Sequence, residues 1–251
     1  MVTAGYDGFP GAVGVSRLRV YDWPTVDGLP GGGTPHLHLT CGEGYVVTAG
    51  SGTVQTLTTS GYRETALEPG TVAWFTPGTI HRLTNGANST TGTNGGGLEI
   101  TVVMQNRGLP EAGDAVLTLP PDLLADAETY AEAVRIPPDV PEDAQADAAR
   151  ARRDLATRWF LELRDATEGG DPEPLAEFQR AAAALVRPRL DDWERRWREG
   201  ARAATDATGA QLAALRDGDP HHLTGARVAA TGPGARGRFG MCGRLDVYPD
   251  L

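Results

Sequence analysis

Two short segments in the first ninety residues hold three of the five histidines of the chain. In the first, His36 and His38 lie on alternate positions and Glu43 follows; in the second, His81 comes shortly after a Pro-Gly pair. Residues i and i+2 of a strand face the same side. A strand through these positions would therefore point His36 and His38 one way and Leu37 the other. Two parallel imidazoles near a carboxylate are half of a metal site, so these segments constrain fold and chemistry together.

The two segments are similar to the paired motifs of the cupin family. The first reads His-x-His-x4-Glu-x6-Gly and the second Gly-x6-Pro-Gly-x2-His-x3-Asn, with about twenty residues between them. The similarity covers roughly residues 15–105. The matching turn and structural positions are Gly50, Gly70, Pro77, Gly78 and Asn85. One departure is Pro30, which stands where the opening glycine of the family is usual, with three glycines directly after it. We expect this departure to change a turn and to leave the ligand positions untouched.

The resemblance implies a mainly β fold, a cupin-type double-stranded β-helix (jelly-roll barrel). It also implies one divalent metal ion, whose ligands by position are His36, His38, Glu43 and His81. Iron, manganese, nickel and zinc all remain open as the metal. The alternative is that the histidines have separate structural roles. The coincidence of three of five histidines with the motif, and of the glutamate with its position, favours the metal site.

The pattern of the chain changes once, near residue 123. Residues 1–122 carry short Val-, Leu-, Thr- and Tyr-rich runs between Gly-, Pro- and Asn-rich turns, which predicts the barrel domain. Residues 123–225 are rich in alanine, arginine and acidic residues, with apolar side chains at helical spacing, which predicts an appended α-helical segment. The predicted helices run through residues 155–163, 175–185, 190–197 and 205–216.

The tail, residues 226–251, becomes strand-like again. We predict strands at Ala226–Ala230 and Phe239–Tyr248, separated by a Gly-, Pro- and Arg-rich turn, and expect the tail to return to the barrel and pair with an edge strand. His221 and His222 precede the tail; without nearby carboxylates or cysteines, an exposed helix end explains them better than a second metal site. The Asn- and Gly-rich segment 85–97 is predicted to be a loop.

Composition excludes several classes of function. A net charge of −10 argues against nucleic acid as a partner, because phosphate binding requires a basic surface. No apolar run is long enough for a membrane helix, and the first residues lack the pattern of a signal peptide. We therefore expect a cytoplasmic protein with Cys41 and Cys242 reduced. The chain contains no lysine, which excludes Schiff-base chemistry.

The motifs alone do not choose a reaction, because one fold hosts many chemistries. We expect a metal-dependent enzyme acting on a small organic molecule, with a dioxygenase favoured over an isomerase or epimerase of a sugar-like substrate because the residues near the ligands are mostly apolar. The alternative from another class is a non-catalytic binding or sensor module. Tyr45, on the same face as Glu43, is a candidate acid, or an aromatic that fills the barrel. Glu99 is a candidate general base if its face of the last barrel strand points inward.

We also expect a homodimer. A barrel with a single motif pair leaves open sheet edges, and exposed edges invite association. The helices or the tail could instead cover these edges within one chain.

Overall fold

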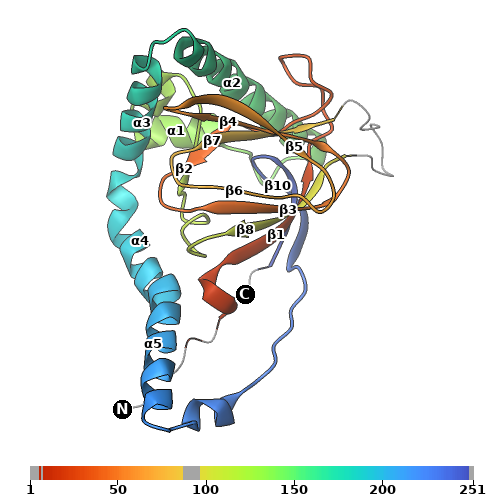
Figure 1. Cartoon of the computed structure of the whole chain (residues 1–251). Coiled ribbons are helices and arrows are strands. Elements are labelled where there is room, and N and C mark those ends of the chain that lie inside the picture. Colours follow the sequence, from red (N-terminus) through yellow and green to blue (C-terminus); the bar gives the residue numbers. More distant parts are fainter. Residues whose placement is uncertain (1–5, 7, 87–96, 249–251) are drawn as a thin grey trace.

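The computed structural model describes residues 6, 8–86 and 97–248. It contains two antiparallel β-sheets, with helices packed against one of them (Figure 1). Most of the predicted loop at residues 85–97 lies outside the described residues.

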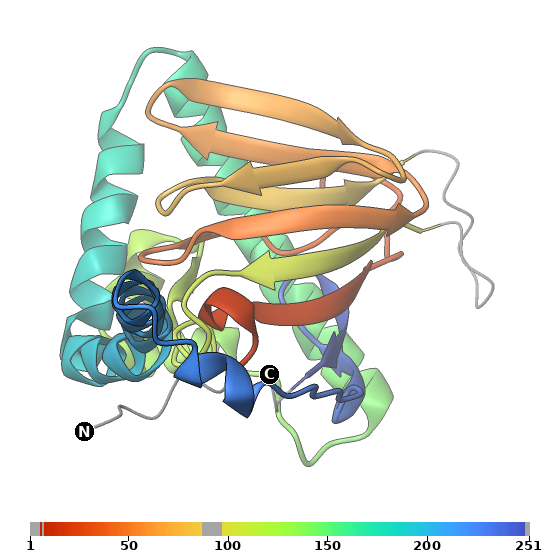
Figure 2. The same cartoon turned by 60° about the horizontal axis from the view of Figure 1, so that its bottom comes forward.

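The two sheets face each other as the halves of a barrel (Figure 2). The six-stranded sheet has the order β10-β11-β1-β8-β3-β6, and the five-stranded sheet has the order β5-β4-β7-β2-β9. The strands are β1 (Gly14–Val20), β2 (His36–His38), β3 (Glu43–Ala49), β4 (Gly52–Thr58), β5 (Gly61–Leu67), β6 (Val72–Phe75), β7 (Ile80–Asn85), β8 (Glu99–Met104), β9 (Ala115–Leu117), β10 (Ala235–Phe239) and β11 (Gly243–Val247). This arrangement is the predicted double-stranded β-helix, with the predicted helical segment after it.

The helical segment follows β9. Its α-helices are α1 (Ala127–Val134), α2 (Glu142–Glu168), α3 (Glu173–Val186), α4 (Leu190–Trp197) and α5 (Ala203–Arg216). Short helical turns are η1 (Pro10–Ala12), η2 (Pro121–Leu124), η3 (Arg187–Arg189), η4 (Arg198–Arg202) and η5 (His221–Gly225). No helix in the described parts of the chain has the length and apolar character needed to cross a membrane.

Strand alternation divides the apolar side chains between two cores. On the barrel side, Leu18, Leu83 and Ile100 belong to a buried cluster that fills the space between the sheets. On the other side of the five-stranded sheet, Leu37 and Ile80 belong to a second cluster, which includes side chains of α2 and α3. Strands β2 and β7 are consequently buried on both faces. The helices therefore cover the outer surface of the same strands that carry the three motif histidines.

The tail returns to the barrel, but its strands differ from the predicted ones. Strand β11 pairs with β1, and β10 pairs with β11, so the tail forms a hairpin at the edge of the six-stranded sheet. Residues 226–230, predicted as a strand, have no regular secondary structure, are exposed and have no strand partner among the described residues. The first tail strand instead lies at Ala235–Phe239, in the segment predicted as a turn, and accommodates Gly237 at a positive φ of 64° within an irregular register.

The helix–sheet core predicts a clear stability effect. The side chain of Phe160 on α2 is 0% exposed within this core. Phe160→Ala should lower the free energy of unfolding by about 3–5 kcal/mol, because it removes buried apolar contacts and leaves a cavity. The matched control, Leu215→Ala on α5, where the leucine is 52% exposed, should change it by less than about 0.5 kcal/mol. Urea denaturation measures both, and equal effects would contradict this description of the core.

Homodimerisation stays a prediction. The tail covers the β1 edge, whereas β6 is the last strand at the other end of the six-stranded sheet and pairs on one side only among the described residues. Val72 and Trp74 on β6 are 58% and 76% exposed. We expect light scattering to give twice the chain mass of 26.5 kDa at micromolar concentration. A mass equal to that of the single chain would refute the prediction.

Candidate metal centre

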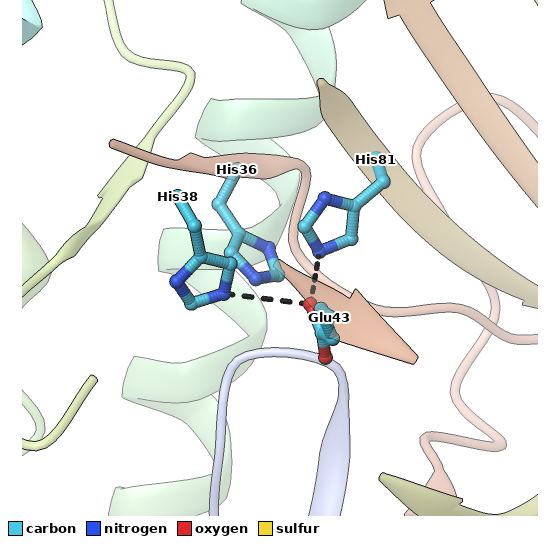
Figure 3. Close-up of side chains that lie close together, drawn as sticks. All are labelled: His36, His38, Glu43 and His81. Carbon is cyan, nitrogen blue, oxygen red and sulfur yellow. Dashed lines mark ion pairs between the residues drawn. The ribbon is translucent and has the colours of Figure 1, made fainter. Parts of the chain in front are cut away.

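The four motif side chains converge on one point inside the barrel. His36 and His38 come from β2, His81 from the neighbouring β7 and Glu43 from the start of β3 in the opposite sheet. Figure 3 shows the three imidazoles pointing toward the Glu43 carboxylate. One ligand atom from each residue lies within 4.8 Å of the others, and all four side chains are buried.

Backbone register explains the convergence. His36 on β2 lies directly opposite His81 on β7, so the two side chains share a face of the five-stranded sheet. His38 lies two residues along the same strand and therefore faces the same way. Glu43 is opposite Phe75 and Met104 within the six-stranded sheet, which places its carboxylate on the facing layer. The site thus joins the two sheets across the barrel.

Each histidine already uses its Nδ1 atom. Nδ1 of His36 lies 2.9 Å from the Thr34 carbonyl oxygen, and Nδ1 of His81 lies 3.1 Å from the Thr79 carbonyl oxygen. A carbonyl oxygen only accepts, so both Nδ1 atoms donate. Nδ1 of His38 lies 3.0 Å from a carboxylate oxygen of Asp114. The three Nε2 atoms are left to face the centre, which is the tautomer that metal binding through Nε2 requires.

The centre contains a contact that a cation would satisfy. Nε2 of His81 and Oε2 of Glu43 are 3.0 Å apart, yet neither atom has a hydrogen-bond partner of good geometry among the described residues. Nε2 of His38 is 3.4 Å from the same Oε2. Two buried acceptors facing one another are unfavourable unless a proton or a cation lies between them. Three imidazole nitrogens and one carboxylate are also ligands that first-row divalent metals accept. The residues therefore fit one metal ion.

The pKa values of the ligands reflect this crowding. Burial, followed by the neighbouring His81 and His38, holds the pKa of His36 well below its ordinary value. Burial also lowers the pKa of His38, but hydrogen bonds to Asp114 and Glu43 outweigh it and raise the pKa to about 9. Burial alone would raise the pKa of Glu43, but His81 and His38 hold it well below its ordinary range. Without metal, His38 therefore carries a proton at neutral pH.

Asp114, which the sequence did not single out, holds His38 in place. It is 0% exposed and lies just before β9. Besides His38 Nδ1, its carboxylate accepts hydrogen bonds from the Thr40 amide at 2.8 Å, the Thr40 hydroxyl at 2.6 Å and the Cys41 amide at 3.3 Å. These hydrogen bonds connect the turn after β2 to His38. Asp114 therefore lies behind the ligand and fixes the orientation of its imidazole ring.

The two candidate catalytic residues lie in different places. Tyr45 shares the inner face with Glu43, but it is fully buried and packs its ring against Phe75 at 5.3 Å between centroids. Its hydroxyl has no hydrogen-bond partner among the described residues. Burial and then the Glu43 charge hold its pKa well above the ordinary value, so Tyr45 stays neutral. Tyr45 is thus a neutral, buried aromatic behind Glu43, as in the alternative of an aromatic that fills the barrel; its role as an acid stays a prediction.

Glu99 is not near the centre. Ile100 and Val102 are the residues of β8 that face the barrel interior, so Glu99 points to the outer face. There its carboxylate accepts a hydrogen bond from Arg17 at 2.5 Å. The condition under which Glu99 would be a candidate base, an inward-facing side chain, is therefore not met, and Glu99 is removed from the candidate bases.

The other histidines and the two cysteines are not part of the cluster of four ligands. His221 and His222 fall on η5, and the described residues contain no second group of His, Cys, Asp and Glu side chains close enough to hold an ion. Cys41 and Cys242 are free and buried. Burial raises the pKa of both thiols above the usual range.

A cavity of about 310 Å³ opens onto His36, His38 and Glu43. Most of its wall is apolar and comes from the inner face of the six-stranded sheet and from the tail hairpin. The apolar lining includes Val15, Leu18, Val102, Met104, Met241 and Val247. Its polar or charged side chains other than the ligands are Ser16, Arg107, Glu111, Arg238, Cys242 and Tyr248. Neither Tyr45 nor His81 lines the cavity, so a small molecule would approach the ion from the side of His36, His38 and Glu43.

The Asp114–His38 pair predicts a pH-dependent effect on metal affinity. Because the His38 pKa is about 9, a proton competes with the metal below that pH, and Zn²⁺ affinity should rise about tenfold per pH unit from 7 to 9. Asp114→Asn should lower the affinity about 10- to 100-fold at pH 9, since His38 loses its orienting carboxylate. The loss should be smaller at pH 7, where the variant also has less proton competition. Titration against a chromophoric chelator measures the Zn²⁺ affinity of the wild type and of the variant at each pH.

The control Asp217→Asn, at an exposed position, should bind Zn²⁺ as the wild type does. An unchanged Zn²⁺ affinity in Asp114→Asn would contradict the role of Asp114 in orienting His38.

Comparisons with known proteins assign no family to this chain. No protein-family model matches the chain, and no curated protein matches it. Among solved structures, a double-stranded β-helix protein from Klebsiella pneumoniae is 18% identical, with a TM-score of 0.25, and the match covers 37% of this chain and 63% of the other. A TDP-quinovose 3,4-ketoisomerase from Campylobacter jejuni is 13% identical, with a TM-score of 0.28, covering 36% and 60%.

A third match, the capsular polysaccharide assembling protein CapF from Staphylococcus aureus, is 16% identical, with a TM-score of 0.32, covering 44% of this chain and 27% of the other. In all three, the match spans less than two thirds of the other protein. Similarity at this level assigns no activity, so the conclusion rests on the chain itself. By its own sheet topology and its buried cluster of His36, His38, Glu43 and His81, the chain is a protein of the cupin fold.

Proposed function

We propose that the chain is a metal-dependent enzyme that acts on a small organic molecule, and that its reaction is an oxygenation by dioxygen. The observation that carries the first part is the convergence of three Nε2 atoms and one carboxylate oxygen on a point that borders a cavity. A divalent ion held there would keep open coordination positions and supply Lewis-acid or one-electron chemistry. A cavity of about 310 Å³ suits a small molecule.

The choice of an oxygenase rests on what surrounds the cavity. A sugar isomerase moves protons and needs a base close to the substrate, together with amides and carboxylates for the hydroxyl groups. Glu99 faces outward, Tyr45 stays neutral, and Glu111, the carboxylate that lines the cavity besides Glu43, accepts a hydrogen bond from the Gly108 amide at 2.8 Å. The apolar lining favours a reaction whose second substrate is itself apolar, as dioxygen is.

The residues of the chain have three tasks in this proposal. His36, His38, Glu43 and His81 would hold the ion. Asp114 keeps His38 oriented through the 3.0 Å contact with its Nδ1 atom. The inner face of the six-stranded sheet and the tail hairpin exclude water and hold the apolar part of the substrate.

The test compares two histidine variants. Purified protein is loaded with Fe²⁺, Mn²⁺, Ni²⁺ or Zn²⁺, and oxygen uptake is measured against panels of small acids, phenols and sugars. His81→Ala should abolish metal-dependent turnover, because it removes one ligand and opens a further water position. The variant should stay folded, with a melting temperature close to that of the chelated wild type, since only the stabilisation by metal is lost. The control His221→Ala, at an exposed position, should keep both properties.

Each alternative has its own outcome. Turnover of a sugar without oxygen uptake would favour an isomerase or epimerase. Metal-dependent ligand binding without turnover under any metal would favour a binding or sensor module. Wild-type turnover by His81→Ala would show that the metal is not the catalyst, and failure of this variant to fold would make the site structural.

A further inference from the structure

The tail hairpin is built into the wall of the cavity, more than one hundred residues after the barrel strands end. Its turn accepts four hydrogen bonds from the body of the protein. The Gly240 carbonyl accepts from the Tyr21 hydroxyl at 2.9 Å and from Arg152 at 2.8 Å. The Met241 carbonyl accepts from the Thr34 amide at 3.0 Å, and the Cys242 carbonyl from the Tyr21 amide at 3.4 Å. Figure 3 shows this blue turn directly below Glu43.

The turn lies against the segment that leads into the ligand strand. A Cβ atom on Gly33 would lie 2.5 Å from the Cα of Cys242, so glycine is required at this position for the backbones to approach. Gly33 is three residues from His36. The hairpin therefore has a defined position relative to the metal ligands, and its side chains can select what reaches them.

Register places one arginine of the hairpin on the cavity side. Leu18 on β1 pairs with Leu245 on β11, and Leu245 pairs with Arg238 on β10. Directly paired residues share a face of a sheet, and Leu18 belongs to the barrel core. Arg238 therefore projects from the inner face, and it lines the cavity at its exposed rim.

Arg238 differs from its neighbours in having no counter-ion. Arg244 forms an ion pair with Glu142 at 2.9 Å, and Arg236 lies 4.0 Å from a carboxylate oxygen of Asp246. The guanidinium of Arg238 has no hydrogen-bond or ion-pair partner within the part of the chain that the structure describes. Besides the metal ligands, two other charged side chains, Arg107 and Glu111, also line the cavity.

We propose that Arg238 recognises the anionic group of the substrate, and that the substrate is a small monocarboxylic acid with an apolar body. The guanidinium binds a carboxylate through two parallel N–H donors. The apolar body lies against Val102, Leu245 and Val247, and the cavity volume of about 310 Å³ limits it to the size of a single ring or a branched aliphatic chain. This inference rests on the proposed function, because it names the substrate class of the same site.

The experiment measures binding of three acids and their uncharged amides. The probes are benzoate, phenylacetate and isovalerate, each paired with its amide, and calorimetry is carried out on chelated and on Zn²⁺-loaded protein. At least one acid should bind more tightly than its amide in both preparations. Arg238→Gln should weaken that acid about 10- to 100-fold, the range expected for a hydrogen bond to a charged group, and should leave the amide unchanged. Arg236→Gln, on the same strand but outside the cavity lining, is the matched control and should bind as the wild type does.

The outcomes separate this inference from the proposed function. Acid binding that depends on Arg238 but not on zinc supports the recognition role even if metal catalysis fails. Acid binding that depends on zinc and is unaffected by Arg238→Gln overturns the recognition role and leaves the metal site intact. If none of the three acids binds the wild type more tightly than its amide, or if Arg236→Gln weakens binding as much as Arg238→Gln, the proposal is wrong.

Discussion

The structure depends on the burial of strand β2 on both faces. Leu37 points into the core between sheet and helices, while His36 and His38 point into the barrel. Imidazoles buried in this way are costly unless their polar atoms are satisfied, and each Nδ1 has an acceptor: two backbone carbonyls and the Asp114 carboxylate. Because the Nδ1 atoms are occupied, the Nε2 atoms must face one another and Glu43. The helices that cover β2 therefore contribute to the site by keeping its outer side dry.

The ligands and the fold support each other through local and distant contacts. Asp114 accepts hydrogen bonds from His38 and from the turn at Thr40 and Cys41, so the loop before β9 orients a ligand on β2. The tail hairpin adds the last wall of the cavity from the other end of the chain. The cavity is consequently formed by three segments: the barrel strands, the loop before β9 and the tail.

The features that were predictable from sequence have local signals. His36, His38, Glu43 and His81 follow from fixed spacing on strands. Helices α3, α4 and α5 and the second half of α2 follow from apolar periodicity, whereas α1 was not predicted. Asp114 was not predictable because its partner His38 is 76 residues away, and a single aspartate before a short strand has no distinctive pattern.

The inward face of β8 was ambiguous because Val103 and Thr101 alternate with Ile100 and Val102. The arginines that alternate with Leu18 and Val20 on β1 were the available signal, since Arg17 pairs with Glu99 on the outer face. The first tail strand was misplaced because a glycine such as Gly237 is typical of a turn. In the structure Gly237 instead lies at an irregularity within the hairpin.

The most direct test of the central claim is anomalous X-ray diffraction from crystals of metal-loaded protein. The account predicts one ion inside the barrel, bound by Nε2 of His36, His38 and His81 at about 2.0–2.2 Å and by a Glu43 carboxylate oxygen at about the same distance. Nδ1 of His38 should remain hydrogen-bonded to Asp114. An ion bound through Nδ1 atoms, an ion that omits one of the four side chains, or no ion at this position after loading would contradict it.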